Sequence, residues 1–197
     1  MTRVILVRHS EANCNVNDTW AGHAGCTGLT PRGRDDSVTV TARLRAIVPD
    51  LEHIALASSL MPRAIETAQI IAGCLGLGRP IESLCGLCER HPGKLDGIPN
   101  RAVRAAIADD HPDARTVEPV GAFLLRTHRA LTRLALAHED RTVVAVTHTG
   151  VIAASFWVYG RVSAKVPFTV PPDNASITAW RSRKGDDMHW RLERHNS

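Results

Sequence analysis

Residues 4–15 read VILVRHSEANCN, an apolar run that ends abruptly in Arg8-His9. An apolar run of this length predicts a short buried strand, which delivers an arginine and an imidazole side by side at its C-terminal end. Two further strand-like runs have similar sequels: HIALASS precedes Arg63, and TVVAVT precedes His148. Because arginine and histidine side chains suit phosphate, the three runs indicate one anion pocket assembled from distant segments.

Strand-like and helical segments alternate along most of the chain. The expected strands cover 4–7, 54–58, 80–84, 142–147, 175–180 and 189–193. The expected helices cover 30–48, 62–75, 101–109, 121–138 and 149–158. Alternation of this kind predicts an α/β fold, a three-layer sandwich with a mostly parallel central sheet and helices on both faces. The last two strands are expected to form an edge hairpin around the polar turn 182–187, which contains Gly185, and residues 10–29 and 86–100 are expected to be loops.

Local signals define two of the helices. Thr30 is a suitable N-cap and Pro31 a suitable first helical residue, while Pro49 ends the same helix. In the helix over 121–138, the residues expected to share one face at helical spacing are Leu124, Leu125, His128, Leu131 and Leu134.

The bulk composition is that of an ordinary globular protein, and we expect a single domain over residues 1–197. The chain is 44% hydrophobic and 22% charged, with a formal net charge of +4. No apolar stretch reaches the roughly 18 residues of a membrane span, and the start does not resemble a signal peptide, so we expect a cytoplasmic protein without a membrane partner. The basic residues are scattered and aromatics make up only 4%, which argues against a nucleic-acid partner.

The five cysteines predict neither a disulfide framework nor a metal site. Their number is odd, and Cys85 and Cys88 form an isolated CxxC pair. A structural zinc site would require a second such pair or regularly spaced histidines, and none is evident. The cysteines are therefore expected to be ordinary thiols, and the histidines without an assigned role are expected to be surface or core residues: His23, His91, His111 and His128.

In open α/β sheets, ligands bind beyond the carboxyl ends of the strands. Arg8-His9, Ser58-Ser59 and His148 all fall at such ends. The turns at Ser59–Arg63 and after His148 also place helix N-termini near the pocket. Their free N–H groups are expected to favour an anion there.

The 4–15 stretch resembles the signature of the histidine phosphatase superfamily, which includes cofactor-dependent phosphoglycerate mutases and many small phosphatases. Asn15 occupies the position of the asparagine that follows the signature histidine by six residues. Other blocks of the family also have counterparts in the same order: GLTPRG at 28–33, SSLMPRAIETAQ at 58–69, LCERHPGKLDG at 87–97, VTHTGVI at 146–152 and NASIT at 174–178. The resemblance covers nearly the whole chain.

The resemblance implies a phosphoric monoester hydrolase with a covalent intermediate. His9 would attack the phosphoryl group to form a phosphohistidine, which water then hydrolyses; neutral imidazole is a good nucleophile near pH 7. Glu89 would give a proton to the leaving oxygen and later take one from water.

The remaining implied site residues would surround the phosphoryl oxygens. They are Arg8, Asn15, Arg63, His148 and Thr149. Arg8, Arg63 and His148 would also stabilise the charge of the transition state. Two arginines and two histidines supply positive charge that a metal provides in other phosphatases, so no metal and no cofactor are expected. The expected partner is a small phosphorylated substrate, and the oligomeric state stays open, a homodimer being one possibility.

Two other functions stay open. One is cofactor-dependent phosphoglycerate mutase chemistry, because Glu89-Arg90-His91 and Gly93 resemble the mutase form of that block; against it, Pro92 replaces the usual tyrosine. The other is a regulatory protein that binds phosphorylated ligands without turnover, although His9 and Glu89 are both present.

The chain also departs from the family pattern. Ser10 stands where glycine is usual, and Asp96 where glutamate is commoner. Contacts to the leaving group are expected from residues 16–26 and 100–122, which vary in the family, so the identity of the substrate is left undetermined.

Overall fold

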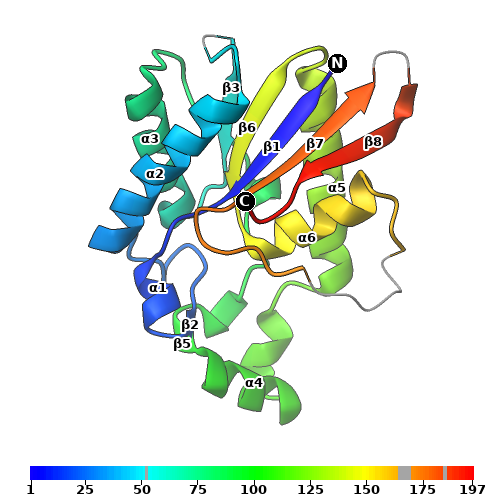
Figure 1. Ribbon diagram of the computed structural model, residues 1–197. Helices are drawn as coiled ribbons and strands as arrows, with labels where there is room; N and C mark the ends of the chain where they lie inside the picture. Colours follow the sequence, from blue (N-terminus) through cyan, green and yellow to red (C-terminus); the bar gives the residue numbers. More distant parts are fainter. Residues whose placement is uncertain (52, 164–169, 184–185) are drawn as a thin grey trace.

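Six strands form the central sheet of the computed structural model, which describes residues 1–51, 53–163, 170–183 and 186–197 (Figure 1). Their order is β4-β3-β6-β1-β7-β8. The strands are β1 (Arg3–Arg8), β3 (Ala55–Ser58), β4 (Glu82–Ser83), β6 (Thr142–Thr147), β7 (Ile177–Arg183) and β8 (Asp186–Arg194). The first four in the spatial order are parallel, and β7 and β8 are antiparallel to their neighbours. The predicted mostly parallel sheet is confirmed.

The C-terminal hairpin is also present, but its strands extend further than expected. Both β7 and β8 reach into the segment predicted as a turn, and Gly185 lies outside the described residues. At the other edge, β4 contains only two residues of the five expected over 80–84.

Helices cover both faces of the sheet, as predicted. On one face lie α2 (Pro31–Ile47) and α3 (Pro62–Leu75); on the other lie α5 (Val120–Ala137) and α6 (Thr149–Val158) (Figure 1). Because side chains alternate along a strand, β1 sends Ile5 and Val7 into the first core and Val4 and Leu6 into the second. A strand buried on both faces explains why VILV reads as a continuous apolar run.

The start of α2 is as predicted: the Thr30 hydroxyl accepts a hydrogen bond from the Gly33 N–H at 2.9 Å, and proline follows at the first helical position. The buried face of α5 agrees with the prediction at Leu131 and Leu134 and differs at two other positions. Leu125 is 51% exposed and His128 is exposed, whereas the face toward the sheet is formed by Phe123, Thr127, Leu131 and Leu134. The buried residues follow one another in steps of four or three from Phe123. Leu125 lies only two positions after Phe123, so its side chain points away from the buried face.

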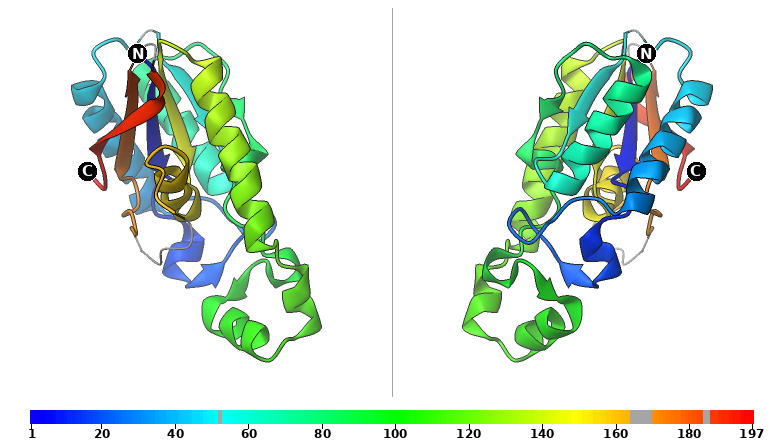
Figure 2. Two further views of the ribbon diagram at one scale, coloured as in Figure 1. Left: turned by 90° about the vertical axis from the view of Figure 1, so that its right-hand side faces the viewer. Right: turned by 90° about the vertical axis from the view of Figure 1, so that its left-hand side faces the viewer.

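A small lobe extends beyond the carboxyl ends of β1 and β6 (Figure 2). It contains α1 (Asn13–Val16), the antiparallel pair β2 (Thr19–Trp20) and β5 (Ile98–Pro99), and α4 (Asn100–Ala108). Three 3-10 turns complete it or lead to it: Cys85–Leu87, Gly93–Leu95 and Pro112–Thr116. Leu95, Val103 and Val117 form its small core.

The prediction that 10–29 and 86–100 are loops was therefore incomplete. Two-residue strands are too short to show a period, and each exists only because the other segment pairs with it.

Among the described residues, no helix combines the length and hydropathy required to cross a bilayer.

Candidate active site

A cavity of about 470 Å³ opens where the carboxyl ends of β1 and β6 meet the small lobe. Its walls contain every site residue predicted from the sequence: Arg8, His9, Asn15, Arg63, Glu89, His148 and Thr149. They also contain residues of the two variable segments and one cysteine: Cys14, Thr19, Trp20, Ala21 and Asn100. The expected convergence of distant segments is present.

The imidazole of His9 is held in one tautomer. Its Nδ1 lies 2.8 Å from the carbonyl oxygen of Ser10, which can only accept, so Nδ1 carries the hydrogen. The Nε of Arg63 donates to His9 Nε2 at 3.1 Å, so Nε2 presents its lone pair. A buried imidazole with an unprotonated Nε2 beside a guanidinium can attack an electrophilic phosphorus.

The backbone at His9 is fixed from two sides. Its N–H donates to Thr147 O at the end of β6, at 2.9 Å. Its carbonyl accepts from the Asn174 side-chain amide at 3.1 Å and from the Ala175 N–H at 3.3 Å. The ring therefore projects from a rigid sheet end rather than from a free loop.

Two guanidinium groups flank the ring. Arg63 is buried and, besides the bond to His9, donates from Nη1 to Ala21 O at 2.9 Å. Arg8 donates from Nη1 to Pro172 O at 2.6 Å, and its buried Nε has no protein partner within the described parts of the chain. Planar guanidinium groups are suited to bidentate binding of phosphate oxygens.

His148 lies opposite His9, with ring centroids 5.1 Å apart. Its Nε2 is 2.7 Å from the hydroxyl of Ser59, while its buried Nδ1 has no hydrogen-bond partner among the described residues. When Ser59 donates to Nε2, the hydrogen of the neutral ring is on Nδ1, which can donate to a ligand in the cavity.

Asn15 presents its amide donor. Its Oδ1 accepts from the Ala12 N–H at 3.0 Å and from Asn174 Nδ2 at 3.3 Å. Since both contacts use the oxygen, the NH₂ group is left for an anion.

The carboxylate of Glu89 is placed by backbone contacts. Oε1 accepts from the Arg90 N–H at 3.0 Å, and Oε2 from the Gly150 N–H, in the first turn of α6, at 2.9 Å. A Cβ added at Gly150 would overlap Glu89 Oε1, so glycine is required for this approach. Arg126 holds the same segment by donating to the carbonyls of Cys88 at 2.9 Å and Glu89 at 3.0 Å.

Burial and positive charge keep both histidines neutral. Burial lowers the pKa of His9 well below the ordinary value, and the charge of Arg63 lowers it further. Burial likewise lowers the pKa of His148 well below its usual range, followed by the effects of Arg63 and His9. A neutral His9 is the nucleophilic form.

Some of the N–H groups near the two helix N-termini are already occupied. At the start of α3, the Leu60 N–H donates to Cys88 Sγ at 3.4 Å and the Met61 N–H to Ser59 Oγ at 3.0 Å, so neither is free for an anion. At the start of α6, the Gly150 N–H is occupied by Glu89. These three N–H groups are therefore not available to an anion.

The two departures from the family pattern have structural explanations. The Ser10 hydroxyl lies 2.7 Å from that of Ser37 in α2, and Ser10 is not among the residues that line the cavity. Asp96 accepts hydrogen bonds from the N–H groups of Gly22, Ala24 and Gly25 at 2.6, 3.0 and 3.0 Å. It anchors the 21–27 loop, whose Ala21 carbonyl contacts Arg63.

Three residues that support the site were given no role from the sequence. Ser59 orients His148, Asn174 fixes both His9 and Asn15, and Arg126 holds the Glu89 segment. Ser59 and Asn174 lie in blocks that resemble family motifs, a signal that could have drawn attention to them. Arg126 lies in a helix with no such motif, and only the fold places it behind Glu89.

The chain is similar to proteins of one superfamily. The family model of the histidine phosphatase superfamily (branch 1) matches residues 4–197. Phosphoglycerate mutase-like protein 4 of Arabidopsis thaliana is 30% identical over 195 residues, covering 93% of this chain and 80% of that protein. The metal-independent phosphoserine phosphatase of the same plant is 28% identical over 170 residues, covering 79% and 68%. The solved structure of a mycobacterial glucosyl-3-phosphoglycerate phosphatase with VO₃ is 26% identical, with a TM-score of 0.77 over 99% of this chain and 98% of that one.

Proposed function

This chain belongs to the histidine phosphatase superfamily, and we propose that it is a metal-independent phosphatase that hydrolyses a small phosphorylated metabolite through a phosphohistidine. The prediction of a phosphoric monoester hydrolase is confirmed at the level of the family, because its relatives include named phosphatases. The substrate and the roles of individual residues are part of the proposal.

One observation carries the proposal: the lone pair of His9 Nε2 faces a cavity lined by Arg8, Arg63 and His148. A phosphoryl group bound there would lie against the nucleophile and within reach of three groups that stabilise negative charge. In the resting site, Arg63 donates to Nε2; a phosphate oxygen would take over this donor and release the lone pair.

The reaction has two displacements at phosphorus. In the first, a bond forms between His9 Nε2 and phosphorus, the bond from phosphorus to the leaving oxygen breaks, and Glu89 gives that oxygen a proton. In the second, water attacks the phosphohistidine, Glu89 takes a proton from the water, and the Nε2–phosphorus bond breaks. The products are an alcohol and inorganic phosphate, and His9 and Glu89 return to their starting states.

Metal independence is proposed from the groups around the phosphoryl site. The guanidinium groups of Arg8 and Arg63 carry two permanent positive charges, and His148 and Asn15 supply neutral donors. Together they can offset the charge on the transferring phosphoryl group, the task that a metal ion performs in other phosphatases. Treatment with a chelator should therefore leave phosphate release unchanged; a loss restored by added divalent ion would contradict this.

The decisive experiment is His9→Ala with a labelled phosphomonoester. We expect phosphate release to fall to background and an acid-labile, base-stable label, present on the parent during turnover, to be missing. His53→Ala is the matched control, because His53 is exposed and distant from the cavity. Undiminished phosphate release in His9→Ala would refute the nucleophile.

Analysis of products separates the two other functions. Interconversion of 2- and 3-phosphoglycerate would indicate a mutase, and binding of phosphate without turnover would indicate a regulatory protein. The substrate screen should begin with phosphoserine and glucosyl-3-phosphoglycerate, for which relatives are named.

A further inference from the structure

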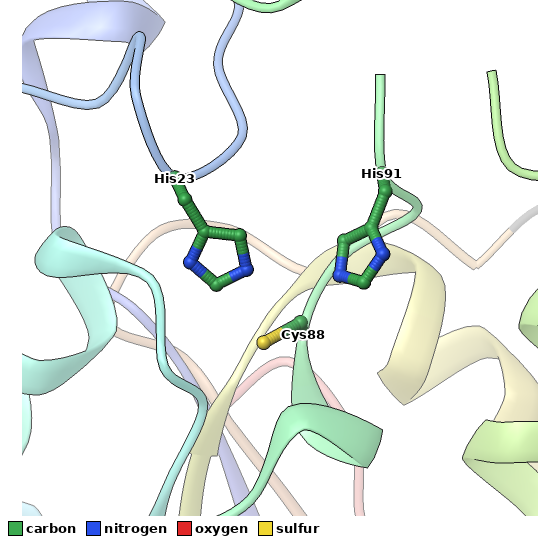
Figure 3. Close-up of side chains that lie close together, drawn as sticks. All are labelled: His23, Cys88 and His91. Carbon is green, nitrogen blue, oxygen red and sulfur yellow. The ribbon is translucent and has the colours of Figure 1, made fainter. Parts of the chain in front are cut away.

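Outside the catalytic cavity, two histidines and a cysteine from separate loops converge (Figure 3). His23 comes from the 21–27 loop, Cys88 follows the 3-10 turn Cys85–Leu87, and His91 lies three residues further on. One donor atom of each lies within 4.8 Å of the others, and the two rings face each other across the buried sulfur. None of the three is among the described residues that line the catalytic cavity.

The surroundings of His91 suit a cationic ligand. Its Nδ1 lies 3.9 Å from Glu118 Oε2, and its Nε2 lies 3.9 Å from Cys85 Sγ. In many zinc sites a carboxylate hydrogen-bonded to one ring nitrogen orients the other nitrogen toward the metal. In this chain Glu118 lies at ion-pair distance from His91 and is itself bound by Arg126. Here the nitrogen that faces away from the carboxylate faces the thiols.

The thiol of Cys88 is buried, and this burial raises its pKa. Its sulfur accepts from the Leu60 N–H at 3.4 Å and lies 3.6 Å from the Ser59 hydroxyl. The Leu60 hydrogen bond partly offsets this cost, because it stabilises the negative charge that a metal-bound sulfur carries, whereas the Ser59 hydrogen is directed to His148.

The two loops are held in place by contacts that do not involve the cluster. Asp96 binds three N–H groups of the loop that carries His23. Arg126 donates to the carbonyls of Cys85 and Cys88 and pairs with Glu118 through two contacts of 2.6 and 2.7 Å. These contacts bring the donors together, and only small side-chain movements separate them from the roughly 3.5 Å spacing of ligands around tetrahedral zinc.

We propose that His23, Cys88 and His91 form a binding site for a borderline-soft divalent metal ion of the Zn²⁺ type, with Cys85 as the nearest further donor. Two imidazoles and a thiolate favour Zn²⁺ or Co²⁺ over Mg²⁺ and Ca²⁺, which require oxygen ligands. On binding, the Cys88 thiol releases its proton to solvent and the sulfur bonds to the metal. The site was not expected from the sequence because His23 is remote from the CxxC pair and reaches it only through the fold.

The test uses Co²⁺ and Zn²⁺ with the reduced, full-length His9→Ala variant, so that the ring pair of the catalytic cavity cannot contribute and the result does not depend on the proposed function. We expect one equivalent of Co²⁺ to produce a thiolate-to-cobalt charge-transfer band and the d–d absorption of a tetrahedral ion. Competing Zn²⁺ should remove both.

Ligand variants in the same background identify the donors. Cys88→Ser should abolish the charge-transfer band, whereas Cys74→Ser, which removes an exposed thiol elsewhere, should preserve it. Because loss of an outer-shell partner alone costs about 10- to 100-fold in affinity, His23→Gln and His91→Gln should each weaken Zn²⁺ binding by at least about tenfold.

Three results would overturn the proposal. They are the absence of a charge-transfer band, loss of the band in Cys85→Ser with retention in Cys88→Ser, and unchanged Zn²⁺ affinity in His23→Gln. His23 is exposed, so its variant tests the site even where a change at buried Cys88 impairs folding.

Discussion

Two pairs of histidine rings lie at similar separations in this molecule, with centroids 5.1 Å apart for His9 and His148 and 5.5 Å apart for His23 and His91. The inner pair is buried at the carboxyl ends of the central strands β1 and β6, among guanidinium groups. The outer pair is carried by loops, beside the thiol of Cys88 and the carboxylate of Glu118. The same kind of ring at a similar spacing therefore meets chemically different neighbours.

The difference shows that neighbours decide what a histidine pair can bind. Positive charge and burial keep the inner rings neutral and leave the cavity with a net attraction for anions. The outer rings lie beside a thiol, a soft ligand that favours a metal ion of the Zn²⁺ type instead. The inner pair is also anchored by the backbone, while one member of the outer pair is exposed. The predictions that follow test the charge, the placement and the anchoring of the inner pair.

The largest effect is expected where the inner pair loses its guanidinium. In Arg63→Lys the positive charge remains, but the fork that contacts His9 Nε2 and Ala21 O is lost. Removal of one preorganised transition-state donor commonly costs about 10²- to 10³-fold in kcat, and we expect a loss of that size here. Steady-state phosphate release provides the measurement.

The matched control is Arg34→Lys, since Arg34 is a half-exposed arginine that pairs with Glu66. Its kcat should equal that of the parent. An Arg63→Lys variant with the parent's kcat would mean that charge alone, without the fork, is sufficient.

A smaller effect is expected from displacing Glu89 without changing it. In Gly150→Ala the new methyl group would overlap Glu89 Oε1, so the carboxylate must move. General acid–base catalysis contributes about 10²- to 10⁴-fold, and partial misplacement should cost part of this, with phosphate inhibition nearly unchanged.

Gly121→Ala is the control for this variant, because an added Cβ there meets nothing within 4 Å. It should keep full activity and gain a little stability from improved helix propensity. Equal kcat in the two alanine variants would show that the position of Glu89 is not critical.

The sequence predicted that His9 and His148 lie close together, but it did not predict the proximity of His23 and His91. His9 and His148 follow continuous apolar runs, which are local signals of buried strands. Because these strands are parallel neighbours, their carboxyl ends lie together regardless of the conformation of the loops. His23 meets Cys88 and His91 only because Asp96 and the β2–β5 pair fold two distant loops together, and two-residue strands leave no pattern to read. Arg126 lies in a helix that was predicted, but its contacts with the segment around Glu89 are distant in sequence, so its role could not be assigned.

A pH titration tests the burial of the inner pair. Because His9 and His148 have pKa values well below that of an unfolded histidine, near 6.5, the unfolded chain binds protons that the folded chain does not. Stability is thus fully present above pH 6.5 and is lost as the pH falls toward the folded-state values. Each proton contributes a slope of up to about 1.4 kcal/mol per pH unit. The free energy of unfolding, measured with urea at several pH values between 6.5 and 5, should change less steeply with pH for His9→Asn than for the parent. An identical pH dependence would mean that His9 titrates normally in the folded protein.

The smallest effect concerns the anchoring of His9. Its Nδ1 hydrogen is bound by the backbone carbonyl of Ser10, whereas the Ser10 side chain points to Ser37 in α2. Ser10→Gly should therefore retain the tautomer of His9 and the activity. Stability should fall by about 1 kcal/mol, the net worth of one buried hydrogen bond. Ser37 would still bond to Gly33 O at 2.8 Å, so no buried hydroxyl is left without a partner. Phosphate release and urea unfolding of the variant measure the two effects separately. A large loss of activity with little loss of stability would show that the serine side chain, and not only the backbone, sets the position of the nucleophile.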